Sequence, residues 1–387
     1  MLKLLLYSHF FAPSVGGVET FSMYLAQGLP RDNGDAAESV FVTVVTQTAG
    51  GDEPDSAEVP FRIIRQPSTQ CLWRLIGGAD KVILAGPAIL PLLFALIRSK
   101  PVVLTHHGYQ SICPNGLLFH LPTQSCCPGH FAAGRYLECV KCNASQETLM
   151  GSTKSLLLTF FRRALSRLAN SNIAVSDHIA RRIALPHVQV IRNGVPVMLP
   201  MKGMSENSKA HICFSYVGRL VTEKGVATLL DAARLLKARN LRFRILIIGD
   251  GPERGRLQTL ASNASLNDEV LFTGFRTGNR LQELLTEVSA VVVPSIWEDA
   301  APLSPLEQMM QSRLIIGSDI GGLAEQIDDA GLKFEAGNAA ALADQIQKVI
   351  ENPHSIVDFG WRARERALRL YSLDRMVQEY RALVQQV

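Results

Sequence analysis

Short apolar runs alternate with amphipathic stretches along almost the whole chain. Between the runs, stretches such as residues 226–236 repeat apolar residues every three or four positions, which is the spacing of an amphipathic helix. Because strands that alternate with helices build parallel sheets, the pattern predicts an α/β fold. The strand-like runs are residues 2–7, 40–46, 102–105, 173–175, 188–191, 212–217, 243–248, 291–294 and 314–317.

The pattern breaks at residues 196–210, where prolines and a glycine precede a polar run. This composition is typical of a linker. A chain of 387 residues is also long enough for two domains. We therefore predict an α/β domain over residues 1–197, a second over residues 198–371, and an amphipathic helix over residues 372–387.

Composition narrows the class of protein. Hydrophobic residues make up 47% of the chain and charged residues 19%, which excludes a disordered protein. The net charge of +4 permits an anionic small molecule or a lipid surface as partner, but does not indicate nucleic acid. The most apolar run, residues 82–97, is short for a membrane span and contains two prolines and a glycine. It predicts a strand, a turn and a buried helix.

The N-terminal residues resemble a first strand, because their apolar part is short and no cleavage site of small residues follows. We therefore expect a cytoplasmic protein. Five of its seven cysteines cluster between residues 109 and 152, where we predict an insertion: Cys113, Cys126, Cys127, Cys139 and Cys142. Disulfides are not favoured in that compartment. A Cys-x-x-Cys pair with two further thiols suits a structural zinc ion, and the alternative, which we favour, is a loop that carries free thiols.

Glycines and cations follow several predicted strands. Gly16 and Gly17 stand where a strand leads into a helix, so the backbone can approach a phosphate closely. Arg219 and Lys224 follow residues 212–217 and suit a diphosphate. Each stretch can equally be an ordinary turn or a solvated loop. The turn at residues 249–254 lacks the third glycine of a dinucleotide fingerprint, and we assign it no ligand.

Two acids, Asp299 and Glu307, lie eight residues apart across a loop that leads into a helix. Carboxylates beside free helix-start N–H groups suit sugar hydroxyls and phosphate together. The alternative is a capped helix start with two exposed acids.

Taken in order, these stretches resemble family 4 of the retaining glycosyltransferases, which have the GT-B fold. The resemblance covers nearly the whole chain and rests on seven motifs. They are Pro-x-x-Gly-Gly-Val-Glu, Thr-x-His, Asn-Gly-Val, Val-Gly-Arg-x-x-x-x-Lys-Gly, Gly-Asp-Gly-Pro, Phe-Thr-Gly-Phe, and Pro-Ser-x-Trp followed by Pro-Leu and Glu.

The resemblance implies two Rossmann-like domains that face each other across a cleft. The C-terminal domain would bind a nucleotide-diphosphate sugar as donor substrate, and the N-terminal domain would take the acceptor. It assigns His107 and Asp299 as catalytic residues. The donor-binding residues that it implies are Gly16, Gly17, Arg219, Lys224, Phe275, Leu303, Ser304 and Glu307.

In this family the anomeric configuration is retained without an established enzymic nucleophile. Cationic side chains would stabilise the departing diphosphate, so no cofactor or metal ion is required. His107 would contact the sugar or its phosphates rather than act as a base. The C-terminal helix commonly packs back on the first domain.

This chain departs from the family at several positions. Asp299 is one methylene shorter than the usual glutamate, and Glu298 could take its place. Ser312 and Leu314 stand where glycine and proline are common. These changes put the identity of the donor in doubt more than the activity.

Residues 155–168 combine leucines and phenylalanines with Arg162, Arg163 and Arg167. Such a helix could rest on the anionic inner face of the cell membrane, with a lipid-linked sugar as acceptor. The alternative is a helix with one buried face and solvated arginines.

The sequence therefore predicts a glycosyltransferase of surface polysaccharide biosynthesis. Two alternatives stay open. One is a non-catalytic subunit that binds a nucleotide sugar, which the shortened acid at position 299 favours. The other is a nucleotide-sugar epimerase on the same fold.

Overall fold

The computed structural model describes residues 1–30, 39–50, 59–200 and 212–387. Contacts within the chain divide it into two compact units. The first comprises residues 1–122, 127–194 and 372–387, and the second comprises residues 123–126 and 195–371. The predicted domain boundary after residue 197 lies three residues from the division after Gly194. The predicted linker at 196–210 falls largely outside the described residues.

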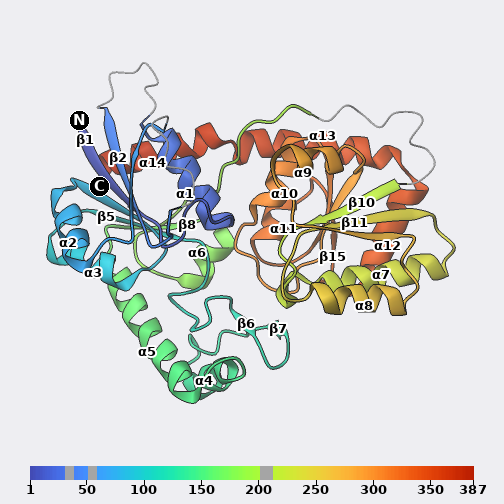
Figure 1. Cartoon of the computed structure of the whole chain (residues 1–387), viewed down its shortest axis with the longest axis horizontal. Helices are drawn as coiled ribbons and strands as arrows, with labels where there is room; N and C mark the ends of the chain where they lie inside the picture. Colours follow the sequence, from blue (N-terminus) through green and yellow to red (C-terminus); the bar gives the residue numbers. More distant parts are fainter. Residues whose placement is uncertain (31–38, 51–58, 201–211) are drawn as a thin grey trace. The chain divides into compact units, whose positions relative to one another are not determined.

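The first unit contains a parallel sheet of seven strands in the order β3-β2-β1-β4-β5-β8-β9 (Figure 1). Its strands are rich in β-branched and other apolar residues, as expected of parallel strands that helices cover on both faces. The strand bounds are β1 Leu2–Tyr7, β2 Val40–Thr46, β3 Arg62–Arg65, β4 Lys81–Ala85, β5 Val102–His106, β8 Ser171–Ala174 and β9 Val188–Val190.

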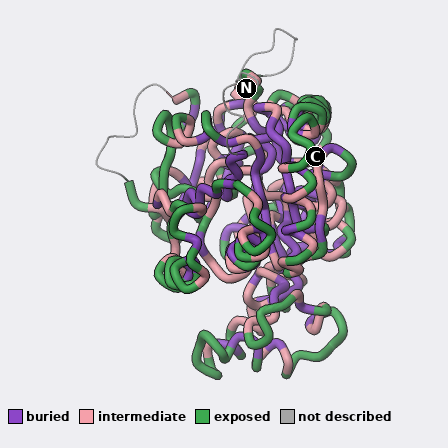
Figure 2. Tube along the Cα trace, turned by 90° about the vertical axis from the view of Figure 1, so that its right-hand side faces the viewer, coloured by how far each residue is buried: buried purple, intermediate pink, exposed green. Residues whose placement is uncertain are grey.

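Alternate residues of β1 enter two different cores. Leu4 and Leu6 pack with α1 (Gly17–Gly28) and α14 (Leu373–Gln386), whereas Leu5 and Tyr7 pack with α2 (Thr69–Gly78) and α3 (Ile89–Ile97). This is the two-residue period of a strand with both faces covered. The strands are accordingly buried along most of their length (Figure 2).

Helix α14 follows the second unit in the sequence but belongs to the first unit. Its residues Met376, Tyr380, Leu383 and Val384 enter the core that contains Leu4 and Leu6. The Tyr380 hydroxyl lies 3.0 Å from the Thr105 hydroxyl, within hydrogen-bond distance. All of the apolar positions predicted to share a helical face, except Leu373, are buried.

Helices α4 (Tyr136–Ala144) and α5 (Leu149–Ser166) form a satellite of the first unit, and α5 runs from the sheet toward α4 (Figure 1). Short strands β6 (Phe119–His120) and β7 (Ser125–Cys126) precede them. Helix α6 (Asp177–Ile183) follows β8 and is capped by Ser176, whose hydroxyl accepts from the Ile179 N–H group. The predicted insertion at residues 109–152 contains β6, β7 and α4, whereas α5 continues to Ser166.

The second unit contains a parallel sheet of six strands in the order β12-β11-β10-β13-β14-β15. Helices α7, α8 and α12 share one core with this sheet, and α9, α10, α11 and α13 share the other. The strands are β10 Ile212–Val217, β11 Phe243–Ile248, β12 Val270–Gly274, β13 Ala290–Val293, β14 Leu314–Ser318 and β15 Leu332–Phe334. The helices are the 3-10 turn η2 Thr222–Lys224, α7 Val226–Ala238, α8 Arg254–Asn263, α9 Gly278–Leu285, α10 Leu303–Met310, α11 Gly321–Ile327, α12 Ala339–Glu351 and α13 His354–Leu370.

The run at residues 82–97 forms β4, a turn and α3, as predicted. The expected burial of this helix is only partly correct, because α3 buries one face and exposes Leu90 and Ile97 on the other. Among the described residues, no helix is both long enough and apolar enough to cross a membrane.

Candidate functional site

The strand order of the second unit fixes where a ligand can bind. The chain passes from β10 to β11 and β12 on one side, and then returns to β13 and β14 on the other. Strands β10 and β13 therefore form a topological switch point. In open parallel sheets, ligands bind beyond the carboxyl ends of the strands at that point. The loops that follow these two strands carry Arg219, Lys224 and Asp299.

The two loops are bound to each other through their backbones. The Ile296 N–H group donates to the Glu223 carbonyl over 3.0 Å. Gly225, which ends the turn η2, has a φ of +67°. A Cβ atom there would lie 1.9 Å from the Pro294 carbonyl oxygen, so only glycine allows this approach. The close approach holds Lys224 beside the loop after β13.

Lys224 and Asp299, separated by 75 residues in the sequence, form an ion pair. Its side chains are largely buried, with 18% of Lys224 and 8% of Asp299 exposed. The Lys224 ammonium also lies 5.5 Å from the centre of the Trp297 ring, a cation–π distance. The structure thus brings together two residues that the sequence singled out separately.

Glu307 lies in α10, a helix positioned by the Ser304 hydroxyl, which donates to the Val217 carbonyl over 3.3 Å. Leu303, at the start of the helix, is buried in the core. Burial raises the pKa of Glu307 to about 7. The carboxyl group therefore changes charge near neutral pH, which is typical of a functional position.

Two further backbone features surround the same switch point. Gly249 and Gly251, after β11, have φ values of +155° and +157° and lie against the backbone of residues 218 and 220. Helix α11 begins at Gly321, and the Gly322 N–H group donates to the Asp299 carbonyl over 2.7 Å. The polar groups at this edge therefore include a helix N-terminus beside the acidic loop.

Arg219 and Phe275 are the exposed candidates of the second unit. The Tyr216 hydroxyl donates to the Arg219 carbonyl over 2.7 Å, which fixes the backbone at that residue. Phe275 follows β12, and its ring is 54% exposed. An exposed cation and an exposed ring are free to contact a ligand, but the structure does not place them against Glu307.

In the first unit the switch point lies between β1 and β4. Gly16 and Gly17 follow β1 and begin α1, with Gly16 as the extended N-cap residue. A Cβ atom at Gly16 would lie 2.4 Å from Oε2 of Glu19, whereas the space beside Gly17 is open within 4 Å. The Gly17 backbone is thus the more accessible of the two glycines.

His107 follows β5, and its ring contacts the Phe21 ring edge-on with centroids 4.3 Å apart. Its Nε2 atom is buried and has no hydrogen-bond partner among the described residues. Burial lowers the pKa of His107 to about 3, so the imidazole is neutral. The neighbouring His106 instead bonds through Nε2 to Oδ1 of Asn172, at 2.9 Å.

Four cysteines of the insertion are buried in the satellite: Cys113, Cys127, Cys139 and Cys142. Burial raises the pKa of Cys113 to about 11 and that of Cys139 to about 12. The Cys142 Sγ atom accepts from the Leu121 N–H group over 3.4 Å. Cys126 is partly exposed.

Zinc binding requires thiolates in a tetrahedral arrangement. In the described ranges, no group of three or more His, Cys, Asp or Glu residues is placed to hold a metal ion. The zinc interpretation therefore gains no support from these residues.

The sequence analysis did not single out Trp297 or Glu223 as site residues. The Trp297 ring lies at cation–π distance from the Lys224 ammonium, and Glu223 acts through its backbone carbonyl. The tryptophan belongs to the quoted motif after β13, so its position was a usable signal. A backbone contact leaves no signal in the sequence.

Residues 204–366 match the family described as Glycosyl transferases group 1. These residues are related to the group 1 glycosyltransferases. They contain Arg219, Lys224, Phe275, Asp299 and Glu307.

Two curated relatives of Streptomyces kanamyceticus share part of the sequence. The 2-deoxystreptamine glucosyltransferase is 27% identical over 144 residues, which is 37% of each chain. The alpha-D-kanosaminyltransferase is 31% identical over 140 residues, 36% of each chain. This chain thus spans little more than a third of the length of these two relatives.

Solved structures match over the whole chain. The Anabaena protein HepE in complex with UDP and glucose has a TM-score of 0.73 at 16% identity, with 100% of both chains covered. Sucrose-phosphate synthase from Thermosynechococcus elongatus has a TM-score of 0.73 at 19% identity, with 100% of this chain and 99% of that chain covered. The predicted fold class, GT-B with two parallel-sheet Rossmann-like domains, is confirmed.

Proposed function

We propose that the protein is a retaining glycosyltransferase of family 4 that transfers a sugar from a nucleotide-diphosphate sugar to a lipid-linked or oligosaccharide acceptor. One observation carries the proposal. The buried pair of Lys224 and Asp299 lies at the switch point of the second sheet, within the segment related to group 1 glycosyltransferases. A UDP-sugar is the donor we expect, since UDP occupies the similar HepE structure.

In the proposed donor site, positively charged side chains act on the departing diphosphate. A departing nucleotide diphosphate gains negative charge, and a fixed cation lowers the energy of that state. Lys224 supplies the cation near the switch point, and Arg219 supplies a second from the same loop. Since these side chains provide the counter-charge, the proposed reaction uses no metal ion.

The two acids have separate roles in this proposal. Asp299 holds Lys224 in place and contacts the sugar. Glu307 accepts a hydrogen bond from each ribose hydroxyl, one on each carboxylate oxygen, and this arrangement favours the ionised form because protonation turns one oxygen into a donor. Leu303 and Ser304 begin the helix that presents Glu307, and Phe275 receives the base.

The first unit contributes Gly16, Gly17 and His107. The open backbone at Gly17 suits a phosphate or a sugar hydroxyl. The buried Nε2 atom of His107 lacks a partner in the described part of the chain, and a sugar hydroxyl would supply one. Its low pKa makes His107 a poor general base, so we propose that it positions the sugar.

A non-catalytic subunit is the second candidate, because Asp299 is paired with Lys224 and is shorter than the family's usual glutamate. Such a subunit would bind the donor without turning it over. Turnover is therefore the measurement that separates the two candidates.

The proposal is tested by donor binding and by donor turnover. Among UDP-, GDP- and ADP-sugars, one donor is expected to raise the unfolding temperature, because a ligand stabilises the state that it binds. Turnover of that donor, measured as kcat/KM, is expected to rise about tenfold from pH 6 to pH 8, because Glu307 ionises with a pKa of about 7.

The Glu307→Gln variant serves as the control for this pH profile. It should show low turnover and no rise near pH 7. Binding without turnover at any pH would favour the non-catalytic subunit. A wild-type rise that persists in the variant would assign the titration to another group.

We further propose that α5 binds the membrane surface from the cytoplasmic side. The residues that α5 buries are small and polar, Ser152, Thr159 and Ser166. Five of its large apolar residues are exposed instead, whereas Leu156, Leu158 and Leu165 are half-buried. The exposed ones are Leu149, Met150, Leu157, Phe160 and Phe161. Lys154 and Arg167 are exposed on the same helix, whereas Arg163 donates to the Ile183 carbonyl over 2.8 Å. This distribution favours a lipid surface over the alternative of a buried apolar face.

Replacing Leu157 and Phe161 together with serine is expected to lower binding to vesicles of phosphatidylglycerol and phosphatidylcholine by at least about tenfold, because both side chains lose their apolar contact. Flotation of the protein with the vesicles measures this. Trp361→Ser is the matched control, since Trp361 is 55% exposed on α13. Equal flotation of wild type and the double variant would refute the proposal.

A further inference from the structure

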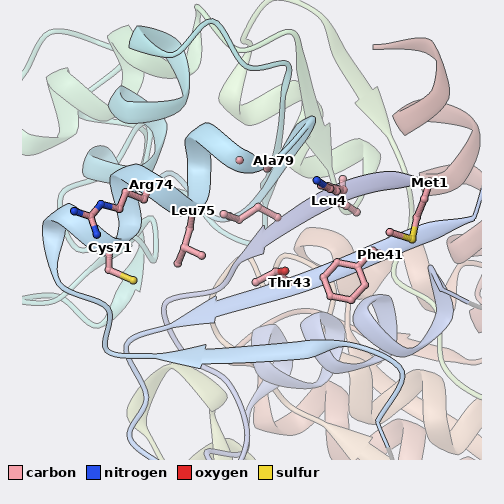
Figure 3. A pocket seen from close by; sticks show the side chains of 11 residues that line it. Met1, Leu4, Phe41, Thr43, Cys71, Arg74, Leu75 and Ala79 are labelled. Atoms are coloured by element: carbon pink, nitrogen blue, oxygen red, sulfur yellow. The ribbon is translucent and has the colours of Figure 1, made fainter.

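A cavity of about 490 Å³ opens on the first unit beside β1 and α2 (Figure 3). We call it the β1–α2 pocket and define it by Lys3, Leu5, Phe41, Cys71, Arg74 and Leu75. Its size lies within the usual range for small-molecule sites. None of the residues assigned to sugar transfer lines it.

The β1–α2 pocket lies away from the loops of the proposed acceptor side. It adjoins the first half of β1, whereas Gly16 and Gly17 follow the carboxyl end of that strand. Lys3 is in register with Phe41, and Leu5 is in register with Thr43 on β2. These four residues therefore share one face of the sheet, which is the face that carries α2.

The lining combines an apolar wall with two cations. Leu5, Leu75 and Phe41 supply most of the wall, and Phe41 is 42% exposed on β2. Lys3 and Arg74 are exposed, and neither forms an ion pair with another described residue. Among the residues that the structure describes, none that lines the pocket is acidic, and the nearby Asp80 carboxylate accepts from the Lys3 N–H group over 2.8 Å. An apolar cavity beside two positively charged side chains complements a ligand that has an apolar chain and a negatively charged end.

We propose that the β1–α2 pocket binds a single-chain amphiphile with an anionic head group. The alkyl chain contacts Leu5, Phe41 and Leu75, and the head group lies beside Lys3 and Arg74. This site is independent of the proposed donor site, so either proposal can fail without the other.

Cys71 allows the pocket to be tested directly, because its thiol lines the pocket and is partly exposed. Dodecyl phosphate, kept below its micelle concentration, is expected to slow alkylation of Cys71 by N-ethylmaleimide about tenfold when nine-tenths of the pockets are filled. Mass spectrometry of peptides measures the rate at each cysteine. Cys126, which is also partly exposed, is the internal control and should react at an unchanged rate.

Two comparisons identify what the pocket recognises. Inorganic phosphate alone should give no protection, which separates an amphiphile site from a phosphate site. Dodecyltrimethylammonium should protect Cys71 less well than dodecyl phosphate, because Lys3 and Arg74 repel its head group.

Two sets of variants test the contribution of the apolar wall and that of the two cations separately. Leu75→Trp fills the pocket and should abolish protection. The double variant of Lys3→Gln and Arg74→Gln should weaken binding of dodecyl phosphate about tenfold, because it removes two exposed charge contacts. Arg181→Gln is the matched control, an exposed arginine on α6 of the same unit.

Three results would overturn the proposal. One is full reactivity of Cys71 at every concentration of dodecyl phosphate while the protein stays folded. Another is equal protection by the cationic amphiphile. The third is protection that rises with protein concentration alone, which would mean that a second copy of the chain covers the pocket.

Discussion

Replacing Lys224 with alanine is expected to lower the turnover of the donor by at least about 100-fold, because the departing diphosphate loses a positioned cation. The same change leaves Asp299 with its carboxylate largely buried and without its lysine. Removing one partner of a buried ion pair costs about 3 kcal/mol of folding free energy. We therefore expect Lys224→Ala to reduce both activity and stability, as measured by donor hydrolysis and by denaturant unfolding.

The double variant of Lys224→Ala and Asp299→Ala separates these two effects. It removes the uncompensated carboxylate, so much of the lost stability should return while turnover stays low. Lys237→Ala is the matched control, because Lys237 pairs with Glu269 at a more exposed position. It should change stability by less than about 1 kcal/mol and leave turnover intact. Recovery of turnover in the double variant would show that Lys224 does not act on the donor.

The second large effect is expected at Gly322, in the first turn of α11. A Cβ atom there would lie 1.8 Å from the Ala300 carbonyl oxygen, a contact that forces the backbone apart. We expect Gly322→Ala to lower the free energy of unfolding by about 3 kcal/mol. It should also reduce turnover strongly, because the displaced backbone includes the residue that follows Asp299.

Gly255→Ala provides a closely matched control for this substitution. Gly255 is likewise the second residue of its helix, α8, and no atom lies within 4 Å of a Cβ built on it. Alanine should therefore stabilise the protein there by up to about 1 kcal/mol and leave turnover unchanged. Equal effects at the two positions would contradict the close packing of α11 against the loop after β13.

The central strands were predictable because they are long and apolar. The predicted bounds of β1, β2, β10 and β11 agree with the structure residue for residue. The strand β3, Arg62–Arg65, was missed because it is short, begins and ends with arginine and lies at the edge of the sheet. Strand β12 was also missed, although its last residues belong to the quoted motif Phe272-Thr-Gly-Phe.

The sequence indicated which residues are candidates for the site, but it did not indicate the contacts between them. Lys224 and Asp299 each belong to a recognisable motif, but their pairing depends on the adjacency of β10 and β13, which the sequence does not state. The raised pKa of Glu307 depends on burial, which is a property of the folded chain. The exposed apolar face of α5 was likewise not predictable, because periodicity alone does not show which face a helix buries.

The path of the chain has a consequence for biosynthesis. Tyr380 and its neighbours on α14 complete the core of the first unit, yet they follow the whole second unit in the sequence. During translation, Leu4 and Leu6 of the first sheet stay incompletely covered until residues 195–371 have been made and α14 can follow. A ribosome that stalls before residue 372 would therefore release a chain whose second unit can be complete while its first unit stays open.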